Sequence, residues 1–188
     1  MTNLFKEIPA GDNLPEEVNV VIDIPKGARN KFEYDQERGY FKLDRALYSP
    51  LFFPFEYGFI PQTYSEDGDS LDVILLATHP TFSGCVIKAR PIGILLMKDE
   101  KGTDNKIIAV PVDKVDPRFK EIKDISDLGE HLREEIKLFF SDYKKLEKEK
   151  YKYVKVEGWR GKEEALKIIE KGVKAWQERV KKKRDNTL

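Results

Sequence analysis

The 188-residue chain carries 34 lysines and arginines against 34 aspartates and glutamates, and it has a single cysteine. This balance excludes an overall electrostatic attraction to nucleic acid or to an anionic membrane, and the lone Cys85 excludes an intramolecular disulfide and a CxxC metal site. The N-terminus lacks a secretion signal and no apolar run approaches the ~18 residues of a membrane span, so we expect one soluble, cytoplasmic domain over residues 1–188.

The first part of the chain has the pattern of strands and turns. Between Val18 and Val112, short apolar runs are separated by Gly, Pro, Asp and Asn, which is typical of antiparallel strands. The runs are "VNVVIDI", "KFEY", "YFKLDRALY", "DVILLA", "VIKARPIGILLM" and "KIIAVPV". Cys85 directly precedes one of them, so we expect it to be a small, buried core residue.

The last third of the chain changes to a helical period. Apolar residues recur every three or four positions from Leu128 to Leu146, which predicts one amphipathic helix over roughly residues 127–148, with Asp127 and Glu130 as its capping pair. The extended stretch "YKYVKVEGW" follows, and a second apolar series from Ala165 to Val180 predicts a helix that ends in "KKKR". Strands followed by helices predict an α+β fold, a small curled sheet or barrel covered by two helices.

Carboxylates recur at the ends of the predicted strands and within them. They are Asp23, Glu33, Asp67, Asp69, Asp72, Asp99, Glu100 and Asp104. A buried carboxylate costs several kcal/mol unless a cation accompanies it, and Lys31, Arg45 and Lys106 lie close to these acids in the sequence. Two interpretations follow: surface ion pairs on a charge-rich protein, or a polar cavity that holds metal ions and an anionic substrate.

Taken together, the acids favour the cavity. Carboxylates from separate strands suit magnesium, which prefers oxygen ligands and keeps several waters, and the chain offers few soft ligands. An EF-hand loop starting at Asp67 would need Gly and Glu where the chain has Asp72 and Thr78, and no Walker A, G-x-G-x-x-G or G-x-S-x-G motif is present. The site must therefore be built from carboxylates, cations and tyrosines.

The stretch "DGDSLDV" resembles the D-G-D-P-x-D-V signature of the soluble family I inorganic pyrophosphatases, of the prokaryotic type. The likeness extends through "LPEEVNVVIDIP", "LDRALYSPLFFPFEYGFIPQT", "VIKARPIGILLMKDEKGTDNKIIAVP", "FFSDYKKLE" and "VKVEGW". The resemblance implies an OB-like, five-stranded antiparallel barrel with flanking helices, usually assembled as a homo-hexamer. It also implies hydrolysis of pyrophosphate to two phosphates with several magnesium ions, for which manganese is a possible substitute.

The same resemblance assigns metal ligands by position. Asp67, Asp72 and Asp104 would hold a first activating metal, and Asp72 would bridge to a second. Asp99 and Asp104 would hold a third metal that arrives with the substrate, and Glu33 would contact a further one on the other phosphate. The mutual repulsion of these acids is then relieved when divalent cations lie between them.

It assigns the reacting groups in the same way. Asp69 would be the general base that accepts the proton of the metal-bound water. Tyr57 and Glu100 would line the cavity, with Tyr57 counted among the catalytic groups together with Lys31 and Arg45. The residues that would grip phosphate oxygens are Lys31, Arg45, Lys106, Tyr143 and Lys144.

Three positions depart from the family pattern. Asp23 stands where the family commonly has Glu, so its contact with a metal through water is expected to be longer or lost. Phe53 replaces a frequent Tyr and removes a hydroxyl, and Ser70 replaces the Pro of the signature and makes that loop less rigid. None of the three removes a predicted metal ligand.

Two other functions are consistent with the same fold. An OB-type barrel can bind single-stranded nucleic acid through a basic groove with stacking aromatics, although zero net charge and a groove rich in carboxylates argue against it. A structural protein that binds metal without turnover is the second alternative. Phosphate release from pyrophosphate in the presence of magnesium separates both from the enzyme.

Overall fold

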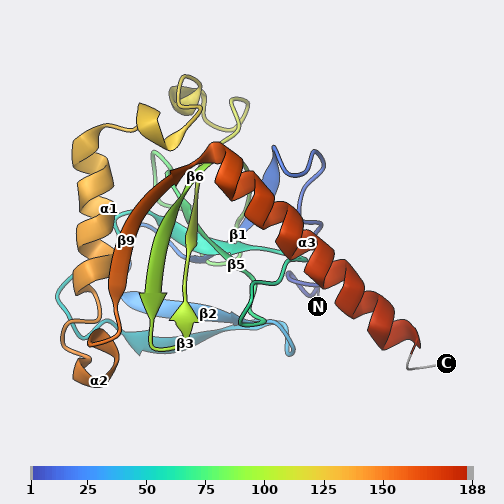
Figure 1. The fold of residues 1–188 in the computed structure, drawn as a ribbon, viewed down its shortest axis with the longest axis horizontal. Coiled ribbons are helices and arrows are strands. Elements are labelled where there is room, and N and C mark those ends of the chain that lie inside the picture. Colours follow the sequence, from blue (N-terminus) through green and yellow to red (C-terminus); the bar gives the residue numbers. More distant parts are fainter. Residues whose placement is uncertain (1, 186–188) are drawn as a thin grey trace.

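The computed structural model describes residues 2–185 and is drawn in Figure 1. Its strands in chain order are β1 (Val18–Ile24), β2 (Asn30–Asp35), β3 (Tyr40–Ala46), β4 (Glu56–Ile60), β5 (Leu71–Leu75), β6 (Val86–Asp99), β7 (Gly102–Thr103), β8 (Lys106–Pro111) and β9 (Lys155–Gly161). Its helices are α1 (Glu130–Asp142), α2 (Lys148–Tyr151) and α3 (Lys162–Asp185), with the short 3-10 turns η1 (Pro117–Phe119) and η2 (Ile125–Asp127).

The strands close into a small barrel. They pair in the order β1, β4, β5, β8 and β6, and β6 pairs back onto β1, which confirms the predicted α+β barrel. Strand β6 is 14 residues long because its first part pairs with β1 and its second part with β9. Strands β2 and β3 form a separate hairpin outside the ring.

One pairing in the barrel is parallel, where the sequence pattern predicted antiparallel strands throughout. Strands β5 and β8 run in the same direction, with Val73 opposite Ile107. The reason is the path of the chain: it leaves β5, crosses to β6 and returns through β7, so that β8 is antiparallel to β6 and enters the ring beside β5. Asp72 and Lys106 each precede this residue pair by one position, so the parallel pairing places them next to each other.

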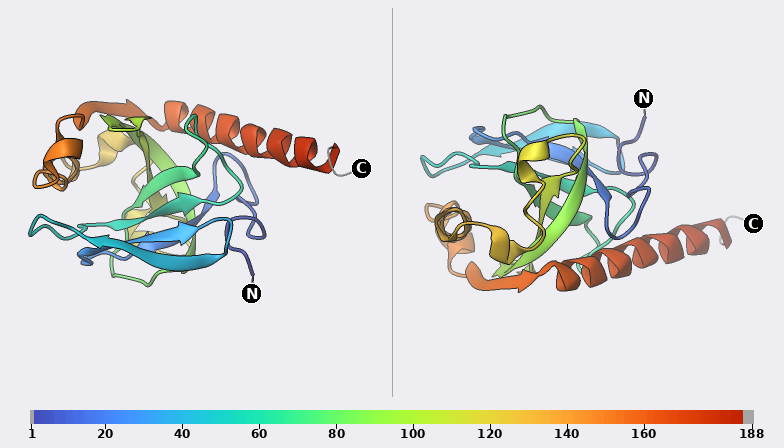
Figure 2. Two further views of the ribbon diagram at one scale, coloured as in Figure 1. Left: turned by 90° about the horizontal axis from the view of Figure 1, so that it is seen from below. Right: turned by 90° about the horizontal axis from the view of Figure 1, so that it is seen from above.

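Each long helix covers one part of the barrel core. Helix α1 buries Ile136, Phe139 and Phe140 in a cluster with the aromatic side chains around β4. Helix α3 buries Ala165 and Ile169 against the strand faces that carry the valines of β1 and β5. Figure 2 shows α3 lying along one side of the barrel, with its last turns projecting past the strands. The expectation of two covering helices is confirmed.

The prediction of the first helix, over roughly residues 127–148, is wrong at both ends. Helix α1 begins after Gly129, which makes no side-chain capping bond, and Asp127 instead belongs to the capping box of η2 with Asp124. The helix ends at Asp142 because the next polar residues, Lys144 and Glu147, are buried with partners in the cavity described below. Those contacts outweigh the helical period that continues in the sequence.

Two smaller observations complete the fold. Cys85 is only half-buried, since it lies in the loop before β6 and packs at the edge of a core cluster, so the prediction of a buried cysteine was too strong. Within residues 2–185, no helix combines the length and the apolar composition that crossing a membrane requires.

Candidate active site

A cavity of about 1040 Å³ opens between the β2–β3 hairpin, the loop before β5, the β6–β7 turn and α3. The side chains singled out from the sequence all line it: Asp23, Lys31, Glu33, Arg45, Tyr57, Asp67, Asp69, Asp72, Asp99, Glu100, Asp104, Lys106, Tyr143 and Lys144. The fold thus brings together residues from seven strands or their adjoining loops and from the end of α1.

Lys106 joins two of the carboxylates at the floor of the cavity. Its side chain is 3% exposed, and its Nζ lies 2.5 Å from both Asp72 Oδ2 and Asp104 Oδ1. Burial raises the pKa of Asp104 to about 6, with Lys106 opposing that rise and Asp72 adding to it. The lysine therefore partly neutralises a pair of acids that would otherwise repel each other.

A second buried lysine lines the same cavity. Lys144 Nζ lies 2.9 Å from Asp99 Oδ2 and 2.8 Å from Glu100 Oε2. Burial alone would lower the pKa of Lys144, but Tyr143 and these two acids hold it above its usual range, so the ammonium stays charged. Burial raises the pKa of Tyr143 to about 12, and its phenol remains a hydrogen-bond donor at neutral pH.

Two further cations face the cavity from the hairpin. Lys31 of β2 and Arg45 of β3 are register partners, so their side chains lie next to each other. Lys31 contacts Glu33, and both cations contact Asp44. Arg45 also donates from Nε to Glu147 Oε1 at 3.1 Å, and the guanidinium stays charged. The hairpin thus presents a fixed pair of positive charges.

Sequence reasoning missed the acids that hold these cations. Asp44 and Glu147 were not singled out, although Asp44 directly precedes Arg45 and Glu147 follows Lys144 by three positions. Glu147 has a side chain that is only 6% exposed, and a buried acid needs a cation. Its partner is more than 100 positions away in the chain, and no local pattern announces such a pair.

The loop before β5 carries two more acids. Asp67 accepts hydrogen bonds from the backbone N–H of Asp69, at 3.0 Å, and from the Ser65 hydroxyl. The turn between them needs Gly68, whose φ of 88° lies in the left-handed region. Asp69 itself is exposed and lies 3.5 Å from the Nζ of Lys101, another residue that sequence reasoning missed. Its carboxylate lines the cavity beside this lysine.

Asp23 is the most deeply buried acid of the set. Its Oδ1 has no hydrogen-bond partner among residues 2–185, and burial, with Asp72 nearby, raises its pKa well above the ordinary 3.8. Burial likewise raises the pKa of Tyr57, whose ring centre lies 5.6 Å from Lys106 Nζ. An unpaired buried oxygen at a cavity wall is costly unless a further group completes its contacts.

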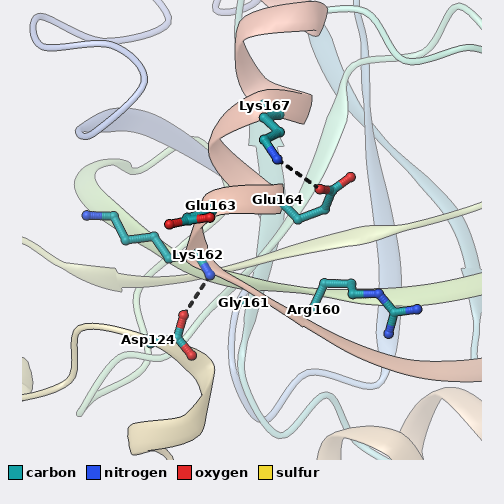
Figure 3. A pocket seen from close by; sticks show the side chains of 7 residues that line it. All are labelled: Asp124, Arg160, Gly161, Lys162, Glu163, Glu164 and Lys167. Carbon is teal, nitrogen blue, oxygen red and sulfur yellow. Dashed lines mark hydrogen bonds and ion pairs between the residues drawn. The ribbon is translucent and has the colours of Figure 1, made fainter.

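A smaller pocket of about 320 Å³ lies at the start of α3 (Figure 3). Asp124 points at the first turn of the helix and accepts the backbone N–H of Lys162 at 2.7 Å. The helix already carries Glu163 and Glu164 in this turn, so carboxylates of the chain itself offset the positive end of the helix dipole. The hydrogen bond from Lys162 to Asp124 at this pocket joins the segment around η2 to the start of α3.

Comparison with known proteins decides between the possible functions of the larger cavity. A family model described as inorganic pyrophosphatase matches residues 20–177, which is most of the chain. The chain belongs to the inorganic pyrophosphatase family. Hydrolysis of inorganic pyrophosphate is therefore the activity that its sequence supports, and the resemblance inferred from "DGDSLDV" is confirmed.

Relatives from other organisms are similar along nearly their whole length. The inorganic pyrophosphatase of Aquifex pyrophilus is 47% identical over 169 residues, which are 90% of this chain and 94% of that protein. The enzyme of Sulfolobus acidocaldarius is 49% identical over 168 residues, 89% and 96% of the two chains. The crystal structure of the Thermus thermophilus inorganic pyrophosphatase superposes with a TM-score of 0.88 at 44% identity, covering 94% of this chain and 99% of that one.

The cavity of this pyrophosphatase family member fits a hard divalent cation by its chemistry. In the part of the chain that the structure describes, no three acidic, histidine or cysteine side chains are close enough to form a finished metal site. Lysines lie between the acids instead, as Lys106 does between Asp72 and Asp104. The candidate donors are nevertheless carboxylate oxygens from several strands and loops, and Asp23 offers one that is unpaired among residues 2–185.

The structure also shows the contacts of Phe53 and Ser70, the two other residues that depart from the family pattern. Phe53 is buried, with its ring centre 4.8 Å from that of Phe139, so the position serves aromatic packing here. Ser70 accepts a hydrogen bond from Gln36 Nε2 at 3.0 Å, which ties the acidic loop to the β2–β3 hairpin. The serine thus replaces the stiffness of a proline with a hydrogen bond.

Proposed function

We propose that this protein hydrolyses inorganic pyrophosphate with the help of several divalent cations, Mg²⁺ in the first place and Mn²⁺ as a substitute. Asp67, Asp72 and Asp104 would hold the activating cations, and Asp99 and Glu33 would hold those that accompany the substrate. When bound, such ions would lower the pKa of a bound water towards neutrality and offset negative charge on the phosphates. One observation carries the proposal: the acids and the buried lysines line one cavity.

The chain's own residues divide the remaining work. Asp69 accepts the proton of the attacking water as the new P–O bond forms and the bridging P–O bond breaks. Its exposed carboxylate can pass that proton on to solvent. Because no protein side chain is required as nucleophile, the reaction needs no covalent enzyme intermediate.

The cations hold and neutralise the substrate. Lys31 and Arg45 reach the phosphate oxygens from the hairpin, and Lys106 and Lys144 reach them from β8 and from the segment after α1. Tyr143 donates from a phenol that stays protonated because its pKa is about 12. Tyr57 and Glu100 complete the lining. These fixed positive charges stabilise the charge that spreads over the phosphoryl group in the transition state.

Phosphate release from pyrophosphate tests the proposal directly. The wild type should release phosphate with Mg²⁺ and stop when EDTA removes it. Asp69→Asn should lower turnover by about 10²-fold or more, which is the usual size of general-base catalysis, while the far-UV spectrum stays unchanged. The matched control is Asp12→Asn, an exposed acid that pairs with Lys88 outside the cavity.

The outcome that would overturn the proposal is folded wild-type protein that releases no phosphate with Mg²⁺. Full activity of Asp69→Asn would instead remove Asp69 from the role of general base.

We also propose, from the resemblance, that the protein acts in the cytoplasm as a homo-oligomer, most simply a hexamer. Sedimentation velocity would give a mass about six times that of the 21.9 kDa chain if the hexamer forms.

A further inference from the structure

Helix α3 runs against the acidic loop, which we define as residues 64–70. The backbone N–H of Tyr64 donates to the carbonyl oxygen of Gly172 at 3.0 Å. This approach requires a glycine, because a Cβ at position 172 would lie 2.7 Å from Leu71 Cδ1. One turn of α3 is thus in direct contact with both ends of the loop.

Two cations of α3 extend this contact. Lys171 Nζ lies 2.7 Å from Oε1 of Glu66, the residue before Asp67. Arg179 stacks on Tyr64, with its Cζ 4.5 Å from the ring centre, and a Cβ on Gly68 would lie 3.8 Å from its Nη1. Within residues 2–185 no carboxylate pairs with this guanidinium, so its contacts are with the loop and with the cavity that it lines.

The loop needs such a support. Among residues 2–185, the carboxylate of Asp67 is bonded only to its own loop, to the Ser65 hydroxyl and the N–H of Asp69, whereas Asp72 lies on barrel strand β5. The distance between the two acids therefore depends on what anchors the loop to the barrel. Tyr64 also packs on the buried Phe5, with ring centres 5.5 Å apart, and Ser70 accepts the Gln36 hydrogen bond at the other end. The remaining side-chain ties come from α3 and from Lys101.

We propose that α3 is a positioning element for the acidic loop, and that Lys171 and Arg179 set the affinity of the cavity for divalent cations. Arg179 lies beyond residues 20–177, the part matched by the family model, so this anchor is a feature of this chain outside the matched region. The inference rests on the proposed role of Asp67 as a metal ligand.

Charge and positioning predict opposite effects, which makes the proposal testable. Removing a lysine or an arginine beside carboxylates strengthens cation binding by Coulomb's law. Losing an anchor of the loop weakens it, because the acid must then be ordered at the moment of binding. If α3 positions the loop, the loss of Lys171 or Arg179 weakens binding in spite of the removed positive charge.

The experiment is a Mn²⁺ titration of the apo protein, with free Mn²⁺ measured by electron paramagnetic resonance. Lys171→Ala and Arg179→Ala should each weaken binding by roughly two- to five-fold, the size expected for one exposed contact. Lys174→Ala removes the same charge from the same helix at a residue that does not line the cavity, and it should bind at least as tightly as the wild type. Far-UV spectra and Tm confirm that each variant is folded.

A charge exchange separates the Lys171 ion pair from a general effect on folding. Glu66→Lys combined with Lys171→Glu keeps the local net charge and should return the affinity to the wild-type value. The proposal is overturned if Lys171→Ala and Arg179→Ala bind Mn²⁺ as tightly as Lys174→Ala, or if the exchange binds no better than Lys171→Ala. Asp67→Asn tests the underlying function: if it binds like the wild type, the metal assignment itself has failed.

Discussion

At the scale of single residues, the buried ammonium of Lys106 offsets the negative charge of two carboxylates, as a metal ion could also do. It lies between Asp72 and Asp104 and is almost fully buried, so its loss leaves two acids facing each other. We expect Lys106→Met to lower the free energy of unfolding at neutral pH in EDTA by up to about 3 kcal/mol, because one partner of a buried ion pair is gone. Urea unfolding measures this, and added Mg²⁺ should restore much of the loss.

Lys88→Met is the matched control for that experiment. Lys88 Nζ is also 2.5 Å from its partner, Asp12, but the two side chains are 38% and 68% exposed. A surface pair contributes about 0–1 kcal/mol, so this variant should stay near the wild type. Equal destabilisation by the two substitutions would show that burial of the Lys106 pair has no special cost.

The raised pKa of Asp104 predicts a dependence of stability on pH in the absence of divalent cations. Its pKa is about 6 in the folded protein against an ordinary 3.8, so between these values the folded state binds more protons than the unfolded state. The contribution of Asp104 therefore favours folding at low pH and is lost as the pH rises through this window, by at most about 3 kcal/mol.

Asp104→Asn removes that titration and isolates it. In EDTA, the Tm of the variant minus that of the wild type should rise as the pH goes from about 4 to about 7, because only the wild type contains the Asp104 carboxyl that titrates there. Thermal melts at four pH values measure the difference. A difference that stays constant with pH would mean that Asp104 titrates normally.

The chemistry of the site could be predicted from single residues, but many of their partners could not. Acids at predicted strand ends, such as Asp72 and Asp104, already indicated a cation site. That Lys106 would lie between those two acids follows only from the parallel pairing of β5 with β8. Glu147 was missed because its partner Arg45 is far away in the chain, and such contacts leave no periodic signal.

At the scale of elements, close packing of β4 on β1 explains a glycine in the middle of a strand. Gly58 lies opposite Ile22, and a Cβ there would be 2.0 Å from the carbonyl oxygen of Val21. Because the obstacle is backbone, Gly58→Ala must push the strands apart, and we expect a loss of about 1–3 kcal/mol in stability. Thermal or urea unfolding checks the value.

Gly129→Ala provides the comparison. No heavy atom lies within 4 Å of a Cβ at this position, and its φ is −53°, which any residue adopts. This substitution should change the free energy of unfolding little, or stabilise slightly by restricting the unfolded chain. If both substitutions were neutral, the close approach of β4 and β1 would be relaxed in solution.

The elements were predictable where local pattern and tertiary contacts agree. The short apolar runs predicted the strands, and the apolar series from Ala165 to Val180 predicted α3. The period from Leu128 to Leu146 overestimated α1, because the residues after Asp142 turn into the cavity to bind Asp99, Glu100 and Arg45. Buried ion pairs thus end a helix that propensity alone would continue.

At the scale of the whole molecule, the account predicts that divalent cations stabilise the fold. Ions that bind the folded cavity but not the unfolded chain add RT ln(1 + [L]/Kd), about 2.7 kcal/mol at one hundred times Kd. Adding Mg²⁺ to apo protein should therefore raise the Tm, and Asp72→Asn should reduce the rise. An identical Tm with Mg²⁺ and with EDTA would count against cation binding in the cavity.

The most direct measurement of the central claim is the position of Mn²⁺ in crystals, located by its anomalous scattering. The account predicts Mn²⁺ within bonding distance of the carboxylates of Asp67, Asp72 and Asp104, with Lys106 moved away from at least one of the last two. Anomalous peaks that lie elsewhere, with these three acids still held by lysine and by their own loop, would contradict it.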